Sequence, residues 1–157
     1  MSEQLFIQGT GGKIEIFVDY PLGEVKGFAV VCHPHPLQGG TPQHKVPALL
    51  AQILAEQGCI VYRPSFRGSG QSEGIHDEGF SETDDILDVI RHVRQLHKSL
   101  PFYVAGFSFG AHVMAKAYHA LPDEIKPKQV ILCGLPTSTV DGVRNYVTPA
   151  IKGDILF

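Results

Sequence analysis

The sequence predicts an α/β fold built on a mostly parallel sheet with helices on both faces. Short apolar runs that suit buried strands alternate along the chain with longer segments whose apolar residues recur at helical spacing. Such alternation is typical of strand–helix–strand units, in which parallel strands are connected by helices that cover the sheet. The sequence has no internal repeat and no linker that would divide it, so we expect one domain over residues 1–157.

The N-terminal region is expected to form an antiparallel hairpin. Residues 5–7 and 13–20 lie on either side of the glycine-rich segment 9–12, and the apolar residues Ile14, Ile16 and Val18 alternate with other types. Buried strands of the parallel sheet are then expected where continuous apolar runs occur, at residues 27–32, 59–62, 102–105 and 129–133. A further strand is expected to begin at residues 154–157.

Three helices are expected between these strands, at residues 46–57, 81–98 and 111–121. Gly58 fits a left-handed stop after the first helix. The second helix has the clearest signals: Ser81 is a candidate cap with Asp84 three residues on, and acidic residues gather in the first turn while basic residues gather in the last.

Composition and charge exclude several classes of partner. The net charge of -3 leaves no basic footprint for nucleic acid or for an anionic membrane. The N-terminus lacks the features of a signal peptide, and no apolar run approaches the ~18 residues of a membrane span. Three cysteines at or next to predicted strands suggest reduced, buried thiols. We therefore expect a cytoplasmic protein without nucleic-acid or membrane partners.

The segment Gly-Phe-Ser-Phe-Gly at residues 106–110 is the strongest functional signal. A G-x-S-x-G run carries chemistry when a strand enters it and a helix leaves it, because the serine then sits on a sharp turn with its hydroxyl exposed. Both neighbours are predicted here, at residues 102–105 and 111–121. We expect Ser108 to be a nucleophile and the backbone N–H of Phe109 to face the developing oxyanion.

A second oxyanion donor is expected from residues 32–41, which follow the first parallel strand and read Cys-His-Pro-His-Pro-Leu-Gln-Gly-Gly-Thr. Pro34 and Pro36 have no N–H group to donate. His35 and Leu37 are the nearest candidates, and we prefer His35. The alternative interpretation is that the two prolines only stiffen the loop.

A metal site formed by His33, His35 and His44 is a competing interpretation of the same stretch. The first two histidines would share one face of a strand. No aspartate or glutamate stands between His33 and His44, however, and three histidines alone make a weak case. We therefore expect neither a metal nor a cofactor.

Residues 63–74 form a third glycine-rich stretch, Arg-Pro-Ser-Phe-Arg-Gly-Ser-Gly-Gln-Ser-Glu-Gly. The stretch contains G-x-G but lacks the later acidic residue of a dinucleotide site, so we expect it to shape the wall of the site instead. His76 and Asp77 follow it, and a role in loop packing is favoured over an approach to Ser108.

The ordered motifs H-P-H-P-x-x-G-G-T, S-F-R-G-S-G-x-S-E-G and G-F-S-F-G resemble the small, lidless bacterial α/β-hydrolases of the dienelactone-hydrolase-like group. The resemblance covers residues 28–157. It implies an α/β-hydrolase sheet with Ser108 as nucleophile and the amides of His35 and Phe109 as oxyanion hole. Family members continue after a strand like 154–157 with the triad aspartate, then a strand and helix with the triad histidine. This sequence stops before both, so a C-terminally incomplete domain is expected.

Substitutes for the missing triad residues are available in principle. Asp141 follows the strand at 129–133, where some hydrolases of this kind place their acid. His35, His76 and His112 are candidate bases. His112 lies one helical turn after Ser108, and helix geometry points its side chain along the helix instead of across the mouth of the turn.

The predicted function is that of a serine hydrolase that cleaves a small ester or related carbonyl compound through an acyl-enzyme on Ser108. The alternative is a non-catalytic binding or interaction protein that keeps the pocket without a complete triad. A sheet that ends at its last predicted strands leaves an uncovered edge, so a homo-oligomer formed through that edge is also expected.

Overall fold

The computed structural model describes residues 2–136, 139–140, 144–146 and 155–156. Seven strands form one sheet in the order β1-β2-β4-β3-β5-β6-β9. Their bounds are β1 Glu3–Gly9, β2 Gly12–Asp19, β3 Gly27–Cys32, β4 Cys59–Pro64, β5 Phe102–Phe107, β6 Gln129–Cys133 and β9 Ile155–Leu156. The helices are α1 Lys45–Glu56, α2 Phe80–Leu96 and α3 Phe109–Ala120. Two further short strands, β7 Thr139–Val140 and β8 Arg144–Asn145, pair with each other.

Strand direction confirms the predicted fold class. β3 pairs in parallel with β4 and β5, and β6 pairs in parallel with β5 and β9. β1 and β2 form the predicted antiparallel hairpin, and β2 joins it to the sheet by pairing antiparallel to β4. The parallel strands therefore end at one edge of the sheet, and the loops that follow β3, β4 and β5 meet there.

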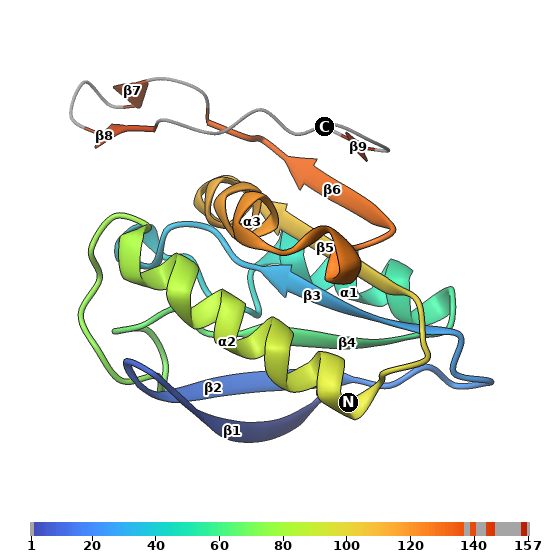
Figure 1. Ribbon diagram of the computed structural model, residues 1–157. Helices are drawn as coiled ribbons and strands as arrows, with labels where there is room; N and C mark the ends of the chain where they lie inside the picture. The colour runs from blue at the N-terminus through green and yellow to red at the C-terminus, as the bar shows by residue number, and fades with distance from the viewer. Residues whose placement is uncertain (1, 137–138, 141–143, 147–154, 157) are drawn as a thin grey trace.

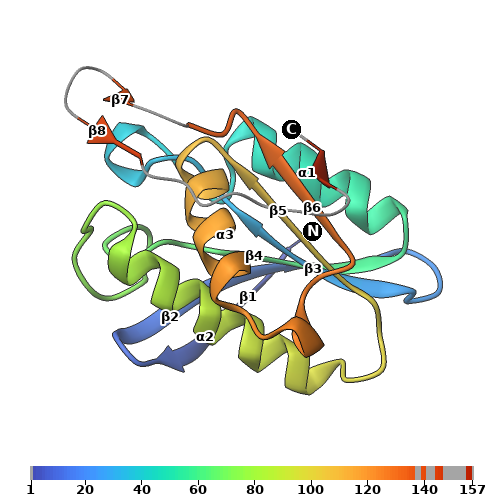
Figure 2. The same cartoon turned by 45° about the horizontal axis from the view of Figure 1, so that its top comes forward.

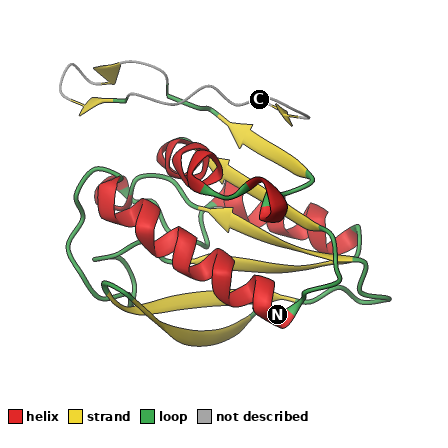
Figure 3. Ribbon diagram, in the orientation of Figure 1, coloured by secondary structure: helices red, strands yellow, loops and turns green. Residues whose placement is uncertain are grey.

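The helices cover both faces of the sheet, with α1 on one face and α2 and α3 side by side on the other (Figures 1 and 2). The face under α2 and α3 holds the larger cluster of buried apolar side chains, in which the rings of Phe28 and Phe102 stack with centroids 4.8 Å apart. The face under α1 buries a smaller set around Val31, Ala51 and Val61. Figure 3 shows that the long connections gather at the ends of the strands.

The predicted elements are found close to their expected bounds, with one wrong cap. Gly58 has the expected left-handed backbone, with φ of 96°. Ser81 does not cap α2, because the helix begins one residue earlier and Gly79 occupies the cap position. The N–H groups at the start of the helix are instead met by carboxylates: Gly79 N–H donates to Glu82 Oε1 at 3.1 Å and Ser81 N–H donates to Asp77 Oδ1 at 2.8 Å.

The region after β6 differs in part from expectation. The predicted strand at 154–157 is represented by β9, and its other residues lie outside the described part of the chain. β7 and β8 lie between the predicted strands at 129–133 and 154–157, where the sequence predicted no strand. None of the helices in the described ranges has the length and apolar character needed to cross a membrane.

Candidate active site

Ser108 occupies a strained turn between β5 and α3. Its backbone has φ of 55° and ψ of -116°, and Glu78 is the only other non-glycine residue with positive φ in the described part of the chain. Such a conformation is sterically unfavourable for a residue with a Cβ and persists only when the surrounding structure imposes it. The strand before the turn and the helix after it are both present, as predicted.

Two glycines allow this turn to pack closely. A Cβ on Gly106 would lie 2.5 Å from the carbonyl oxygen of Gly110. A Cβ on Gly110 would lie 2.6 Å from the carbonyl carbon of Cys32, and closer still to the carbonyl oxygens of Cys32 and His33. Real Cβ atoms essentially never approach other heavy atoms within 3.0 Å, so glycine is required at both positions.

Backbone hydrogen bonds fix the position of Ser108 in the sheet. Its N–H donates to the carbonyl of Cys133 at the end of β6, with a distance of 2.8 Å. Its carbonyl accepts from His112 N–H at 3.1 Å, which begins the hydrogen bonding of α3. Phe109 is the first residue of α3, where the N–H has no acceptor within the helix, so its amide suits an anion.

The loop after β3 is held by His33, a role that sequence reasoning missed. The His33 side chain is fully buried; its Nδ1–H donates to the carbonyl of Pro34 at 2.7 Å, and its Nε2 accepts from Phe66 N–H at 3.0 Å. These partners set one tautomer, and burial lowers the pKa of His33 to about 4. The bond to Pro34 could not be predicted from the sequence, because its acceptor is a backbone carbonyl, which every residue has.

The backbone of the same loop folds around His35. The His35 carbonyl accepts from the N–H groups of Gln38 and Gly40, at 3.1 and 3.0 Å. Leu37 N–H donates to the Nδ1 of the His35 ring at 3.3 Å. Since this bond occupies the N–H of Leu37, His35 is the better of the two candidate oxyanion donors, and its role stays a prediction.

Residues 63–74 support this loop from the side of β4. Phe66 packs edge-on against Phe109 with ring centroids 5.3 Å apart. The glycine-rich part is anchored by the buried Glu15 of β2, whose Oε1 accepts from Ser65 Oγ at 2.8 Å and from Gln71 N–H at 3.2 Å. Glu15 was also missed, because a glutamate within an alternating strand normally faces solvent.

The three candidate bases, His35, His76 and His112, all lie around the ring of Phe109. Among the described residues, Ser108 Oγ makes no hydrogen bond to a histidine ring. His112 is buried against Tyr146, with ring centroids 4.7 Å apart, and burial lowers its pKa to about 4. His35 and His76 pack against Phe109 and point toward Glu78. Asp141 lies outside the described residues.

The metal set weighed from the sequence is also not assembled. Both ring nitrogens of His33 are engaged by protein groups. His44 stacks on Phe107 with centroids 5.6 Å apart, and its Nδ1 accepts from Val46 N–H at 3.4 Å. His35 instead belongs to a different group with His76 and Glu78.

A cavity of about 600 Å³ lies between α1 and the connection from β2 to β3. Its lining comes from residues 19–24 at the end of β2 and after it, from α1 residues between Ala48 and Glu56, and from Lys26, Gln57, Gly58 and Arg63. It shares no residue with the turn at Ser108 or with the loop after β3. We therefore place the candidate site at the carboxyl ends of the parallel strands, where the strained serine lies.

Comparisons with known proteins agree with this architecture. Solved relatives include a lidless α/β serine hydrolase from Xanthomonas campestris, with a TM-score of 0.81, 33% identity and coverage of 92% of this chain and 66% of that one. An α/β serine hydrolase homologue from Coxiella burnetii has a TM-score of 0.79, 39% identity and coverage of 86% and 64%. The uncharacterized protein RP471 of Rickettsia prowazekii (strain Madrid E) is 31% identical over 121 residues.

The chain is shorter than these relatives. It spans 51% of the length of RP471, and 66% and 64% of the two solved chains. The family model described as serine aminopeptidase, S33, matches residues 26–148, which include β3 to β6 and the turn at Ser108. This match covers most of the sequence and shows that the chain belongs to the serine aminopeptidase S33 family of α/β hydrolases.

Proposed function

We propose that this chain carries the nucleophile and the oxyanion hole of a serine hydrolase that acts on a small ester or related carbonyl compound. The observation that carries the proposal is the strained backbone of Ser108 between β5 and α3, imposed by close packing at Gly106 and Gly110. A backbone strained at one serine, at the carboxyl end of a parallel sheet, is the arrangement of a nucleophile elbow.

The proposed reaction begins when Ser108 Oγ attacks the substrate carbonyl carbon and gives up its proton to a base. The negative charge moves to the carbonyl oxygen, where the N–H groups of Phe109 and His35 would stabilise it. The tetrahedral intermediate then expels the alcohol, which takes up a proton, and leaves an acyl-enzyme. Water attacks the acyl group and releases the acid. We assign the base to none of the described residues.

A fluorophosphonate probe tests the proposal directly. The probe phosphonylates an activated serine, so we expect one adduct on the purified chain, mapped by mass spectrometry to Ser108. Ser108→Ala is expected to abolish the adduct. Ser99→Ala is the matched control, because Ser99 is an exposed loop residue and its loss is expected to leave labelling unchanged. Labelling that survives in Ser108→Ala would show that the nucleophile has been misassigned.

A second candidate function is binding without turnover. It is favoured by the observation that, in the described ranges, no histidine ring reaches Ser108 Oγ, and a serine without a base is a weak nucleophile. A folded protein that resists the probe but binds a small carboxylate, with NMR shifts at the amides of His35 and Phe109, would support this reading over catalysis.

We further propose that the chain associates through an edge of its sheet and works in the cytoplasm. β1 and β9 are the outer strands of the sheet, and an unpaired edge is a template for pairing. The three cysteines are free thiols, with Cys32 and Cys59 buried, which suits a reducing compartment.

A further inference from the structure

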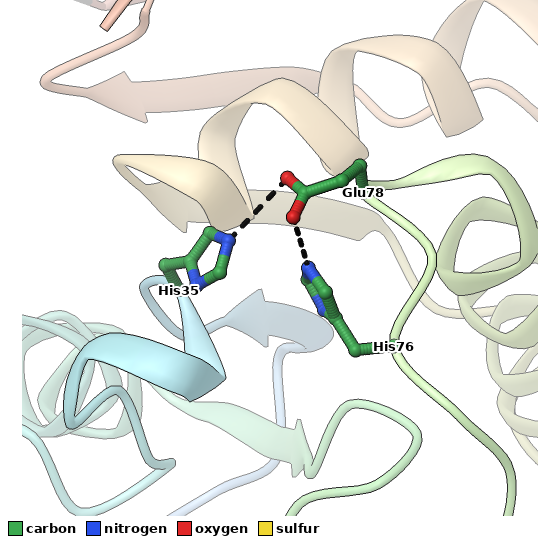
Figure 4. A group of neighbouring side chains, drawn as sticks. All are labelled: His35, His76 and Glu78. Carbon is green, nitrogen blue, oxygen red and sulfur yellow. Dashed lines mark hydrogen bonds and ion pairs between the residues drawn. The ribbon is translucent and has the colours of Figure 1, made fainter. Parts of the chain in front are cut away.

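Three side chains from two loops meet beside the loop after β3. Glu78, just before α2, places its carboxylate between the rings of His35 and His76 (Figure 4). Its Oε2 lies 3.4 Å from His35 Nε2, and its Oε1 lies 3.0 Å from His76 Nε2. The ligating atoms of all three residues lie within 4.8 Å of one another.

These separations are close to those of ligand atoms around a single metal ion, and small rotations of the side chains would bring all three ligand atoms onto one ion. Zinc binds histidine nitrogen and carboxylate oxygen at about 2.0–2.2 Å, and tetrahedral geometry then places neighbouring ligand atoms about 3.3 Å apart. Two imidazoles and one carboxylate form a donor set that suits Zn²⁺. We propose that His35, His76 and Glu78 bind one zinc ion, with water as the fourth ligand.

A buried carboxylate supports His76 from behind. The Nδ1 atom of His76 lies 2.9 Å from Glu82 Oε2. The Glu82 side chain is fully buried, and its carboxylate accepts hydrogen bonds from the N–H groups of Asp77 and Gly79. The contact with His76 Nδ1 is not aligned as a hydrogen bond, and Nδ1 has no hydrogen-bond partner among the described residues. A metal on Nε2 fixes the proton on Nδ1, and carboxylates behind ligating histidines have this orienting role.

The backbone at Glu78 is strained. Its φ of 62° costs free energy in a residue with a Cβ, and the described part of the chain shows this strain elsewhere only at Ser108 among non-glycine residues. The Glu78 side chain is half exposed, whereas those of His35 and His76 are each 7% exposed. The ion would therefore be held on its protein side by the histidines and reached by solvent from the side of Glu78.

Binding has one identifiable cost at His35. Leu37 N–H donates to the Nδ1 of that ring at 3.3 Å, which requires Nδ1 to be unprotonated. A metal on Nε2 requires the proton on Nδ1, so the zinc-bound form gives up this long hydrogen bond. The alternative is a cluster without metal, in which the His76 ring is held between the carboxylates of Glu78 and Glu82.

The proposal goes beyond hydrolysis and predicts a cross-link between the loop after β3 and the loop before α2. A ligand bound only by the folded state raises stability with its concentration. At zinc concentrations a hundredfold above Kd, the expected rise in Tm is roughly 5–10 °C for a chain of this length.

The test uses the purified chain after treatment with EDTA. Isothermal titration with ZnCl₂ is expected to give one site per chain, and Co²⁺ is expected to give the visible absorption of a tetrahedral complex. His76→Gln should lose the site, whereas His92→Gln should keep it, because His92 is exposed on α2 away from the cluster. Circular dichroism of each variant shows whether the fold is intact.

Glu78→Gly is the decisive variant. Glycine removes a ligand but suits a φ of 62°, so the metal-free variant is expected to melt at or above the wild-type temperature while its zinc affinity falls at least tenfold. Equal zinc binding in wild type, His76→Gln and Glu78→Gly would overturn the proposal as adventitious surface binding. A folded wild type that takes up no zinc would also overturn the proposal and leave the cluster as a packing contact between the two loops.

Discussion

Replacing Gly110 by alanine sets two effects of opposite sign against each other. Gly110 is the second residue of α3, and alanine in a helix is more favourable than glycine by about 0.5–1 kcal/mol. The new Cβ, however, would lie within 3.0 Å of backbone atoms of Cys32 and His33. Backbone atoms cannot rotate away as side chains do, so α3 and the end of β3 must separate.

The steric effect is expected to win. Overpacking of this kind typically costs about 1–3 kcal/mol, and here two carbonyl groups are affected together, so we expect a net loss near the upper end of that range. For a chain of this length, that loss lowers Tm by roughly 5–10 °C. Because the shift also moves Phe109 N–H relative to Ser108, probe labelling should fall on the order of 10²-fold.

Thermal denaturation followed by circular dichroism, together with the rate of fluorophosphonate labelling, provides the assay. Gly23→Ala is the matched control, because a Cβ at Gly23 meets nothing within 4 Å, and its Tm should stay close to that of wild type. A Gly110→Ala protein that melts at or above the wild-type temperature would refute the close approach of α3 to β3 and leave helix propensity as the dominant effect.

Three other predictions concern the surroundings of the site. His33→Ala leaves Phe66 N–H without its acceptor and should lower the free energy of unfolding, measured in urea, by about 2–4 kcal/mol. His92→Ala, on the surface, is the control and should leave it almost unchanged; equal effects of the two variants would contradict the role assigned to His33. Burial raises the pKa of Glu82 from 4.5 to about 7, so the Tm of wild type should fall relative to that of Glu82→Gln as pH rises from 5 to 8. A Tm difference that stays constant over this range would contradict the raised pKa. Light scattering should give a mass about twice 17.1 kDa, and a monomer at all concentrations would exclude edge association.

The sign of the pH effect follows from the direction of the shift. The folded state holds the Glu82 proton more tightly than the unfolded chain does, so the stabilisation is complete below pH 4.5 and disappears as pH rises through about 7. His33 and His112 shift the other way: their pKa falls to about 4, so they favour the folded state as pH rises. Comparison with Glu82→Gln at each pH separates the carboxyl group from these histidines.

The sequence was most informative where local chemistry and fold agree. The alternation of apolar runs predicted the parallel strands, and the spacing around Ser108 predicted a turn between a strand and a helix, because only glycine fits at residues 106 and 110. The helix after the turn begins at Phe109, two residues earlier than predicted, since periodicity does not register the residues that form the turn itself.

The interactions that the sequence did not predict are contacts between distant segments. Serine is a common cap residue, but Ser81 does not cap α2, because Gly79, with a left-handed backbone, occupies the cap position. The N–H groups at the start of the helix donate instead to the carboxylates of Asp77 and Glu82. Glu78 is joined to His35 across 43 residues by a contact that no local pattern records. Long-range pairing of this kind depends on how loops cross at the end of the sheet, and spacing along the chain does not determine it.

The hydrogen bond from Ser108 N–H to the carbonyl of Cys133 makes the Ser108 amide sensitive to fraying at the outer edge of the sheet. β6 is held on one side by β5 and on the other by β9, which pairs with it through Ile155 and Leu156. When β9 separates, β6 becomes the outer strand, and its fraying would break the bond that holds the serine backbone. Hydrogen–deuterium exchange of the Ser108 amide therefore measures how often β9 and β6 separate from the sheet, although Ser108 follows β5, two strands inside the outer strand β9.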